Sequence, residues 1–73
     1  MKEFTLRAFY DDEAHVWVGE NDDLPLATEA DTLDGLLVRA TEVAPEIAFD
    51  NGLIAHGDRV IIHLVADRQS VPA

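Results

Sequence analysis

The spacing of apolar residues switches between two periods along this chain of 73 residues, and that switch limits the possible folds. Apolar residues occupy alternate positions in segments 2–10, 14–20 and 59–66, whereas they recur every third or fourth position in segment 33–47. Alternation is typical of strands, and the longer spacing is typical of an amphipathic helix. With a short strand over 26–30, the sequence predicts an α+β domain with the element order β-β-β-α-β.

We expect the strands to form an antiparallel sheet of three or four strands, with one kinked helix on one face. Pro45 lacks the backbone donor of a helical residue, so the helix is expected to kink or break there. Asp31 or Thr32 is placed to cap its start, and Gly52 suits the left-handed conformation that ends many helices. The apolar faces of these elements give the predicted core: Phe4, Leu6, Ala8, Val16, Val18, Leu33, Leu36, Leu37, Ala40, Ile47, Val60, Ile62 and Leu64.

The first two strands are expected to form a hairpin around the polar turn Asp11-Asp12-Glu13. A three-residue loop would pair Tyr10 with Ala14. In that register Trp17 lies on the face away from the helix, beside Arg7, where the two side chains make a cation–π pair. The alternative places Trp17 in the core, with the two faces of the second strand reversed.

The last strand is apolar on both faces, although one helix covers only one face of a sheet. The uncovered face would expose a larger apolar patch than monomeric proteins usually show. Its members are Phe9, Trp17, Ile61 and Val65. We therefore expect a homodimer or a larger assembly that covers this candidate dimer face.

The charge balance points to a protein partner, because fifteen acidic residues face only five basic ones and the formal net charge is −10. Such a surface repels phosphate backbones and anionic lipid, so we expect neither direct nucleic-acid binding nor membrane binding. It attracts a basic protein, and the acidic turns form the candidate partner-binding surface: Asp11, Asp12, Glu13, Asp22 and Asp23. The alternative is that the acidity only keeps the protein soluble.

The length favours a single domain over residues 1–73, with a frayed tail at 67–73. The absence of cysteine rules out disulfides and zinc–thiolate sites. No apolar run has the length of a transmembrane helix, and the first residues do not resemble a signal peptide, so a cytoplasmic location is expected.

Residues that often carry chemistry are present, but without the spacing that catalysis or metal binding requires. His15, His56 and His63 have no neighbours at metal-ligand spacing, and the adjacent carboxylates in the turns lack the pattern of a calcium loop. Ser70 has no partner histidine or oxyanion loop, and no glycine-rich phosphate loop occurs. We expect a protein that is not an enzyme and has no cofactor or metal, and a metal-dependent nuclease is the least favoured alternative.

Segment 23–37 resembles the signature of HicB-like antitoxins, in which an aromatic hairpin precedes a D-L-P-G segment, a short strand with T-E/G-D-T and an acidic, leucine-rich helix. The hairpin here is His15-Val16-Trp17-Val18-Gly19-Glu20, and a looser match covers residues 4–66. Within that superfamily the chain is most similar to a short, single-domain branch without an assigned function. Leu26 departs from the pattern, since the family often has glycine there.

The resemblance implies a partial ribonuclease-H-like fold without nuclease activity. HicB proteins typically bind and mask HicA, a small basic ribonuclease toxin, so a HicA-like protein is the partner that the resemblance implies. Many also carry a carboxy-terminal DNA-binding segment; no such pattern occurs up to Ala73, and operator binding is not expected. The alternative function is a self-associating module without a toxin partner.

Overall fold

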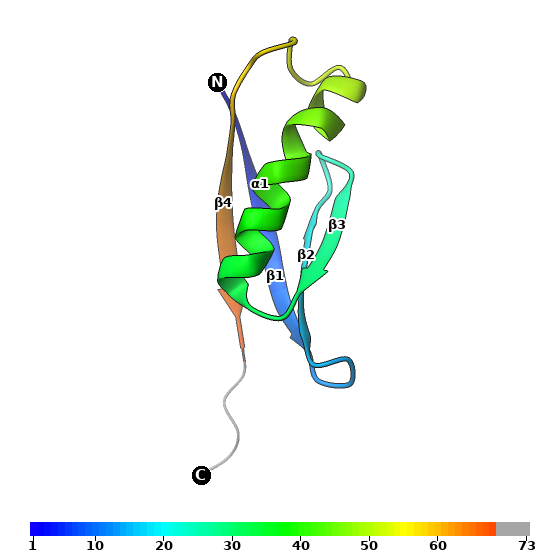
Figure 1. The fold of residues 1–73 in the computed structure, drawn as a ribbon, viewed down its shortest axis with the longest axis vertical. Helices are drawn as coiled ribbons and strands as arrows, with labels where there is room; N and C mark the ends of the chain where they lie inside the picture. The colour runs from blue at the N-terminus through cyan, green and yellow to red at the C-terminus, as the bar shows by residue number, and fades with distance from the viewer. Residues whose placement is uncertain (69–73) are drawn as a thin grey trace.

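The computed structural model describes residues 1–68 and contains one sheet and one helix (Figure 1). The elements are β1 (Lys2–Asp11), β2 (Val16–Asn21), β3 (Leu26–Ala30), α1 (Leu33–Asp50) and β4 (Val60–Asp67). This confirms the predicted order. The predicted tail at 67–73 falls largely outside the described residues, and Asp67 itself still belongs to β4.

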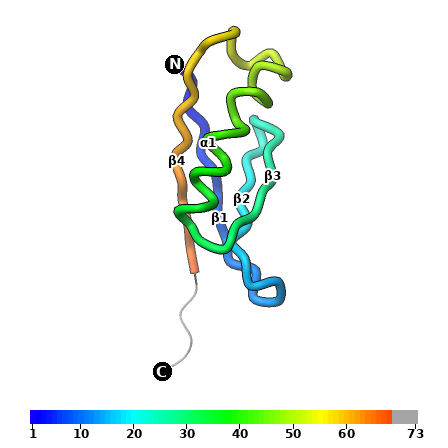
Figure 2. Tube along the Cα trace, in the orientation of Figure 1, coloured from blue at the N-terminus to red at the C-terminus, as the bar shows by residue number. Residues whose placement is uncertain are grey.

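The sheet is mixed, so the prediction of an antiparallel sheet was wrong for one strand. The strand order is β3-β2-β1-β4, in which β1–β2 and β2–β3 are antiparallel and β1–β4 is parallel. The Cα trace in Figure 2 shows α1 running back along the sheet before β4 begins. A helical connection of this kind returns the chain in the direction of the strand before it, which here is also the direction of β1.

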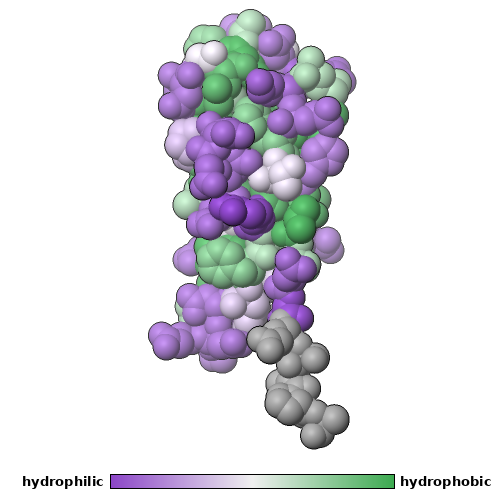
Figure 3. Space-filling model, turned by 180° about the vertical axis from the view of Figure 1, so that it is seen from behind, coloured by the Kyte–Doolittle hydropathy of each residue, from purple (hydrophilic) through white to green (hydrophobic). Residues whose placement is uncertain are grey.

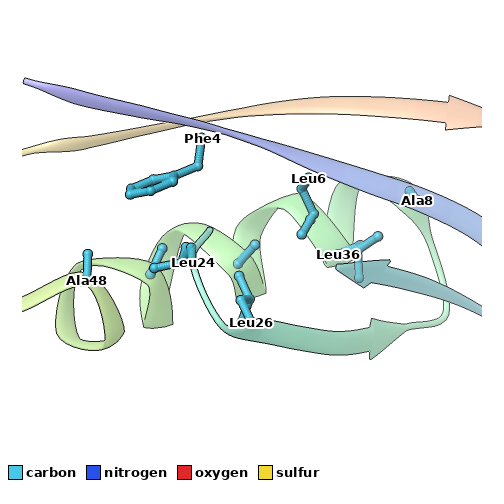
Figure 4. Packing of buried hydrophobic residues seen from close by; sticks show 9 residues of the cluster. Phe4, Leu6, Ala8, Leu24, Leu26, Leu36 and Ala48 are labelled. Carbon is cyan, nitrogen blue, oxygen red and sulfur yellow. The ribbon is translucent and has the colours of Figure 1, made fainter. Parts of the chain in front are cut away.

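The core lies between α1 and one face of the sheet. Figure 4 shows Phe4 and Leu6 of β1 pointing toward the helix, with Leu36 close to Leu6. The buried hydrophobic residues are Phe4, Leu6, Ala8, Leu24, Leu26, Leu36, Ala40, Ala44 and Ala48. Other predicted core residues pack against this cluster while partly buried: Leu33, Ile47, Val60, Ile62 and Leu64. Leu37 is half-buried and lies outside the cluster.

The β1–β2 hairpin adopts a different register from the predicted one. Tyr10 pairs with Trp17 and not with Ala14, a displacement of three residues. The turn is longer than expected, because His15 takes a positive φ of 57° and donates its backbone N–H to the Asp11 carbonyl at 2.8 Å. When the pairing of a strand shifts by an odd number of residues, the side chains expected on one face of the sheet lie on the other.

The reversal moves Trp17 and Gly19 to the face under α1, whereas Val16 and Val18 lie on the other face. Val16 and Val18 are therefore outside the core, contrary to prediction. A Cβ atom at Gly19 would lie 2.8 Å from Cδ2 of Leu6 and 3.0 Å from Cδ2 of Leu36. The missing side chain lets α1 approach the sheet closely at this point.

The β2–β3 turn is fixed by the side chain of Asn21. Its Nδ2 donates to the Thr5 carbonyl at 2.6 Å, and its Oδ1 accepts the backbone N–H of Leu24 at 2.6 Å. A tight turn around Pro25 then brings the Leu26 N–H to the Leu24 carbonyl at 2.5 Å. This geometry buries Leu24 completely, and the sequence pattern had not predicted it as a core residue.

Helix α1 starts at the predicted cap and continues through its proline. Thr32 has extended backbone angles, and its hydroxyl accepts the N–H of Gly35 at 2.9 Å. The helix is unbroken from residue 33 to 50, so the alternative of a break at Pro45 was wrong, while a kink there stays a prediction.

The carboxy-terminal end of α1 closes as predicted around Gly52, which has a φ of 71°. The Gly52 N–H donates to the Phe49 carbonyl at 3.0 Å, and the Leu53 N–H donates to the Ala48 carbonyl at 2.9 Å. These are the two bonds of a Schellman motif, and Leu53 packs against the core cluster as that motif favours.

Candidate functional site

The face of the sheet opposite α1, called the open face below, is formed by alternate residues of all four strands. No helix covers it within the described residues, and Figure 3, viewed from behind the sheet, shows apolar and polar side chains interspersed on it. Three members of the predicted dimer face lie there: Phe9 is 44% exposed, Ile61 38% and Val65 51%. The structure therefore brings these three onto one surface.

Trp17, the fourth member, lies on the helix side of the sheet, so its assignment to the dimer face was wrong. Its ring packs edge-on against Tyr10, with ring centroids 5.3 Å apart, and it contacts the core cluster. The alternative that kept Trp17 in the core is the one that the register supports. Arg68 covers the Tyr10 ring at 4.2 Å from its centroid, so the cation–π pair in the described residues joins Arg68 to Tyr10.

Arg7 does not stack on Trp17 but bridges two carboxylates. Its Nη2 lies 3.2 Å from Oδ2 of Asp22 and 3.6 Å from Oε1 of Glu20. The cross-strand pairing of Arg7 with Glu20 places all three groups at the β2 side of the open face. The positive charge at the centre of this face is thus already neutralised within the chain.

A shallow depression of about 330 Å³ lies beside Phe9 on the open face. Phe9 and Val65 provide its apolar wall, while Glu20 and Asp67 contribute carboxylates and Arg7 the paired cation. Asp67 lies opposite Phe9 in the β1–β4 register, so an acidic residue is the direct strand neighbour of the aromatic one, and both line the depression. A concave apolar surface with carboxylates beside it suits a side chain with an aliphatic stem and a positive charge.

The other charged residues of the open face also make it acidic. Following the strand register, the acidic residues of the open face are Glu3, Asp11, Glu20, Glu29 and Asp67. The basic ones are Arg7 and His63, and Nε2 of His63 lies 2.7 Å from Oε1 of Glu3. This last pair could not be predicted from the sequence, because a contact between β1 and β4 depends on their parallel register.

The two predicted acidic turns do not form one surface, since they lie at opposite ends of β2. That strand has six residues, which separates the turns by roughly 20 Å. Asp11 accepts the N–H groups of Glu13 and Ala14 through Oδ1, at 3.0 and 3.2 Å, so it stabilises its own turn. Asp12 is 88% exposed and lies 3.9 Å from Arg68.

The second turn lies beside the open face, because Asp22 is bound to Arg7. Asp23 follows it as an exposed residue directly before the buried Leu24. The candidate partner-binding residues therefore divide into two groups. Asp22 and Asp23 border the apolar part of the open face, whereas Asp11, Asp12 and Glu13 occupy the far hairpin.

The other grooves and side-chain groups in residues 1–68 are weaker candidates for a functional site. No group of three His, Asp or Glu side chains is arranged there to hold a metal ion. A larger open groove of about 760 Å³ runs beside β3, between its edge and Gly35 and Arg39 of α1. His56 packs edge-on against Phe49, with ring centroids 5.6 Å apart. The single helix of the described residues lacks the run of apolar residues needed to cross a membrane.

Fold and surface together define a small α+β domain in which, over residues 1–68, the mixed sheet is covered by a helix on one side only. Within that class, the chain belongs to the family described as "Domain of unknown function (DUF1902)", whose model matches residues 3–73. A crystal structure of hypothetical protein TTHA1013 from the extremely thermophilic bacterium Thermus thermophilus has a similar fold and sequence. Its TM-score is 0.79 at 42% identity, with 96% of this chain and 99% of that chain covered. No curated protein matches the chain.

Proposed function

We propose that this chain is a non-enzymatic, cytoplasmic protein-binding domain whose partner is a small basic protein, in the manner of a HicB-like antitoxin that masks a HicA-like ribonuclease. The observation that carries the proposal is the depression beside Phe9. It combines exposed apolar surface with the carboxylates of Glu20 and Asp67. Aromatic anchors surrounded by charge of one sign are typical of interfaces with partners of the opposite sign.

The charge of the whole chain supports the same partner. A formal net charge of −10 on 73 residues creates a negative field that steers a basic protein toward it. The attraction is screened over about 10 Å at 0.1 M salt, so the association rate should fall as ionic strength rises. The resemblance of segment 23–37 to HicB-like antitoxins indicates which kind of basic protein this is. It would be a ribonuclease, and the domain would cover its RNA-binding surface.

Self-association through the open face is the alternative function, and its charge disfavours it. Stacking two copies face to face would bring five carboxylates of each copy toward five of the other, with one arginine on each side to offset them. Like charges placed together at an interface cost binding energy. A basic partner removes this cost and still covers Phe9, Ile61 and Val65.

The experiment is co-expression of this chain with the product of its neighbouring reading frame, followed by calorimetry and an RNA-cleavage assay. The proposal expects a stable complex and loss of ribonuclease activity. Phe9→Ala should raise the Kd by about tenfold or more, because truncating an aromatic anchor typically costs more than about 1.4 kcal/mol. Val38→Ala is the matched control, since Val38 is 55% exposed on α1, on the other side of the molecule.

Two results would contradict the proposal. One is the absence of any basic partner in the purified material, together with full activity of a cognate HicA-like ribonuclease in excess of this chain. The other is equal loss of affinity in the Phe9 and Val38 variants, which would place the interface elsewhere. In the first case the self-associating module becomes the better account of the protein.

A further inference from the structure

The outer edge of the sheet at β4 has the properties of a strand that pairs with another strand. In the order β3-β2-β1-β4 it pairs with β1 on one side, and no described strand lies on its other side. It is eight residues long, with the sequence Val-Ile-Ile-His-Leu-Val-Ala-Asp. Edges left exposed in native proteins are usually short or carry lysine, proline or a bulge, and this strand has neither lysine nor proline.

Both faces of β4 are incompletely covered. On the helix side, Val60, Ile62 and Leu64 contact the core cluster but are only partly buried. On the open face, Ile61 and Val65 are among the exposed large hydrophobic residues of the chain. A strand added beside β4 would reduce the exposure of both sets at once.

The charges at the two ends of β4 make this edge complementary to itself. Arg59 precedes the strand and Asp67 ends it, and neither makes an ion pair within residues 1–68. They are eight positions apart in the sequence, so they lie roughly 26 Å apart and cannot reach each other within one chain. The register places Asp67 on the open face together with Ile61 and Val65. Arg59 directly precedes β4, and continued alternation would direct it to the same face.

We propose that β4 pairs antiparallel with β4 of a second copy of this chain, about a two-fold axis through His63. In this register Arg59 lies opposite the partner's Asp67, Ile61 lies opposite the partner's Val65, and Ile62 lies opposite the partner's Leu64. The two sheets become one sheet of eight strands, with both helices on the same side. An isologous contact of this kind repeats each ion pair twice.

The register is fixed by charge and by the pleat. A shift of one residue would place core-side residues opposite open-face residues, which the alternation of side chains forbids. A shift of two residues keeps the faces matched but places either Arg59 opposite the partner's Val65 or Asp67 opposite the partner's Ile61. Only the register centred on His63 pairs Arg59 with Asp67 and apolar residues with apolar residues.

This edge contact does not depend on the proposed function. It leaves Phe9 and Glu20 uncovered on the open face, while it engages Asp67, the other carboxylate beside Phe9. It also joins the apolar residues of β4 in both copies into one continuous strip on that face. The basic partner proposed above would then meet a doubled surface and a doubled negative charge.

Charge reversal gives a direct test by sedimentation equilibrium. The wild type is expected to form a dimer in the micromolar range. Arg59→Asp and Asp67→Arg should each raise the dimer dissociation constant by about tenfold, since each change replaces two attractive pairs with two repulsive ones. A 1:1 mixture of the two variants should restore association as a heterodimer, and the double variant R59D/D67R should restore the homodimer.

Matched controls separate the edge contact from a general effect of charge. Arg39→Asp makes the same change of charge on the β3 side of α1, and Glu42→Arg matches Asp67→Arg on the exposed surface of α1. Both controls should dimerise like the wild type. A wild type that stays monomeric at high micromolar concentration would overturn the proposal. So would single variants that dimerise as tightly as wild type, or a mixture of the two that fails to associate.

Discussion

Replacing Gly19 by alanine tests the close approach of α1 to the sheet. The new Cβ would lie 2.8 Å from Cδ2 of Leu6 and 3.0 Å from Cδ2 of Leu36. Both leucines are at most 1% exposed, so neither has free space to move into. Forcing an extra carbon into a packed core typically costs about 1–3 kcal/mol.

One effect acts in the opposite direction, because alanine in a strand is favoured over glycine by about 0.5–1 kcal/mol. The net loss of stability should therefore be about 1–2 kcal/mol. In a domain of this size each kcal/mol lowers the Tm by roughly 4–8 °C, so we expect a fall of about 5–15 °C by calorimetry. Gly35→Ala is the control: its Cβ would meet the Thr32 hydroxyl at 3.0 Å in an exposed first turn, and helix propensity favours alanine there.

A second variant makes the origin of the loss explicit. In the background of Leu36→Ala the crowding at Gly19 is reduced, so Gly19→Ala should cost less than it does in the wild type. A Gly19→Ala protein that is as stable as the wild type would refute the reasoning. An equal cost in the two backgrounds would show that Leu36 does not hold the helix against Gly19.

Trp17→Ala should lower the free energy of unfolding by about 2 kcal/mol, because a half-buried aromatic ring that packs on Tyr10 is lost. The Trp17→Ala protein should sediment with the same oligomeric mass as the wild type. A changed oligomeric mass at unchanged stability would instead indicate that Trp17 lies on the open face. Asn21→Ala should cost about 1–2 kcal/mol in urea denaturation, since the Leu24 N–H and the Thr5 carbonyl both lose their partner. Asn21→Asp retains the acceptor for Leu24, so it should lose less, and equal losses would show that this bond does not hold the turn.

The element order could be predicted because each segment carries its own period. The direction of β4 could not be read from the same signal, since alternation is identical in parallel and antiparallel strands. A helical connection between strands of one sheet was the available clue to a parallel pair. In the hairpin, alternation continues through Ala14 and His15 into the strand, so the pattern conceals where the turn ends. The end of the turn is set instead by the hydrogen bond from the His15 backbone N–H to the Asp11 carbonyl.

The candidate site was partly predictable for the same reason. Phe9, Ile61 and Val65 were placed together because their strands were correctly recognised and their faces followed from period two. Trp17 was misplaced because an error of three residues in register reverses a whole strand. The ion pair of Arg7 with Asp22 depends on that register and on a turn that bends back toward β1, and neither is visible in the sequence alone.

The parallel pairing of β1 with β4 has a consequence for how the protein is made. Lys2 pairs with Val60 and Phe9 with Asp67, so β1 meets its second neighbour only after β2, β3, α1 and β4 have all been synthesised. Until then β1 can form its hairpin with β2, while its other edge stays open to unwanted pairing. Contacts between such distant parts of a chain also slow folding. β1, one of the two inner strands of the sheet, is thus synthesised before its neighbours and gains its second paired strand last.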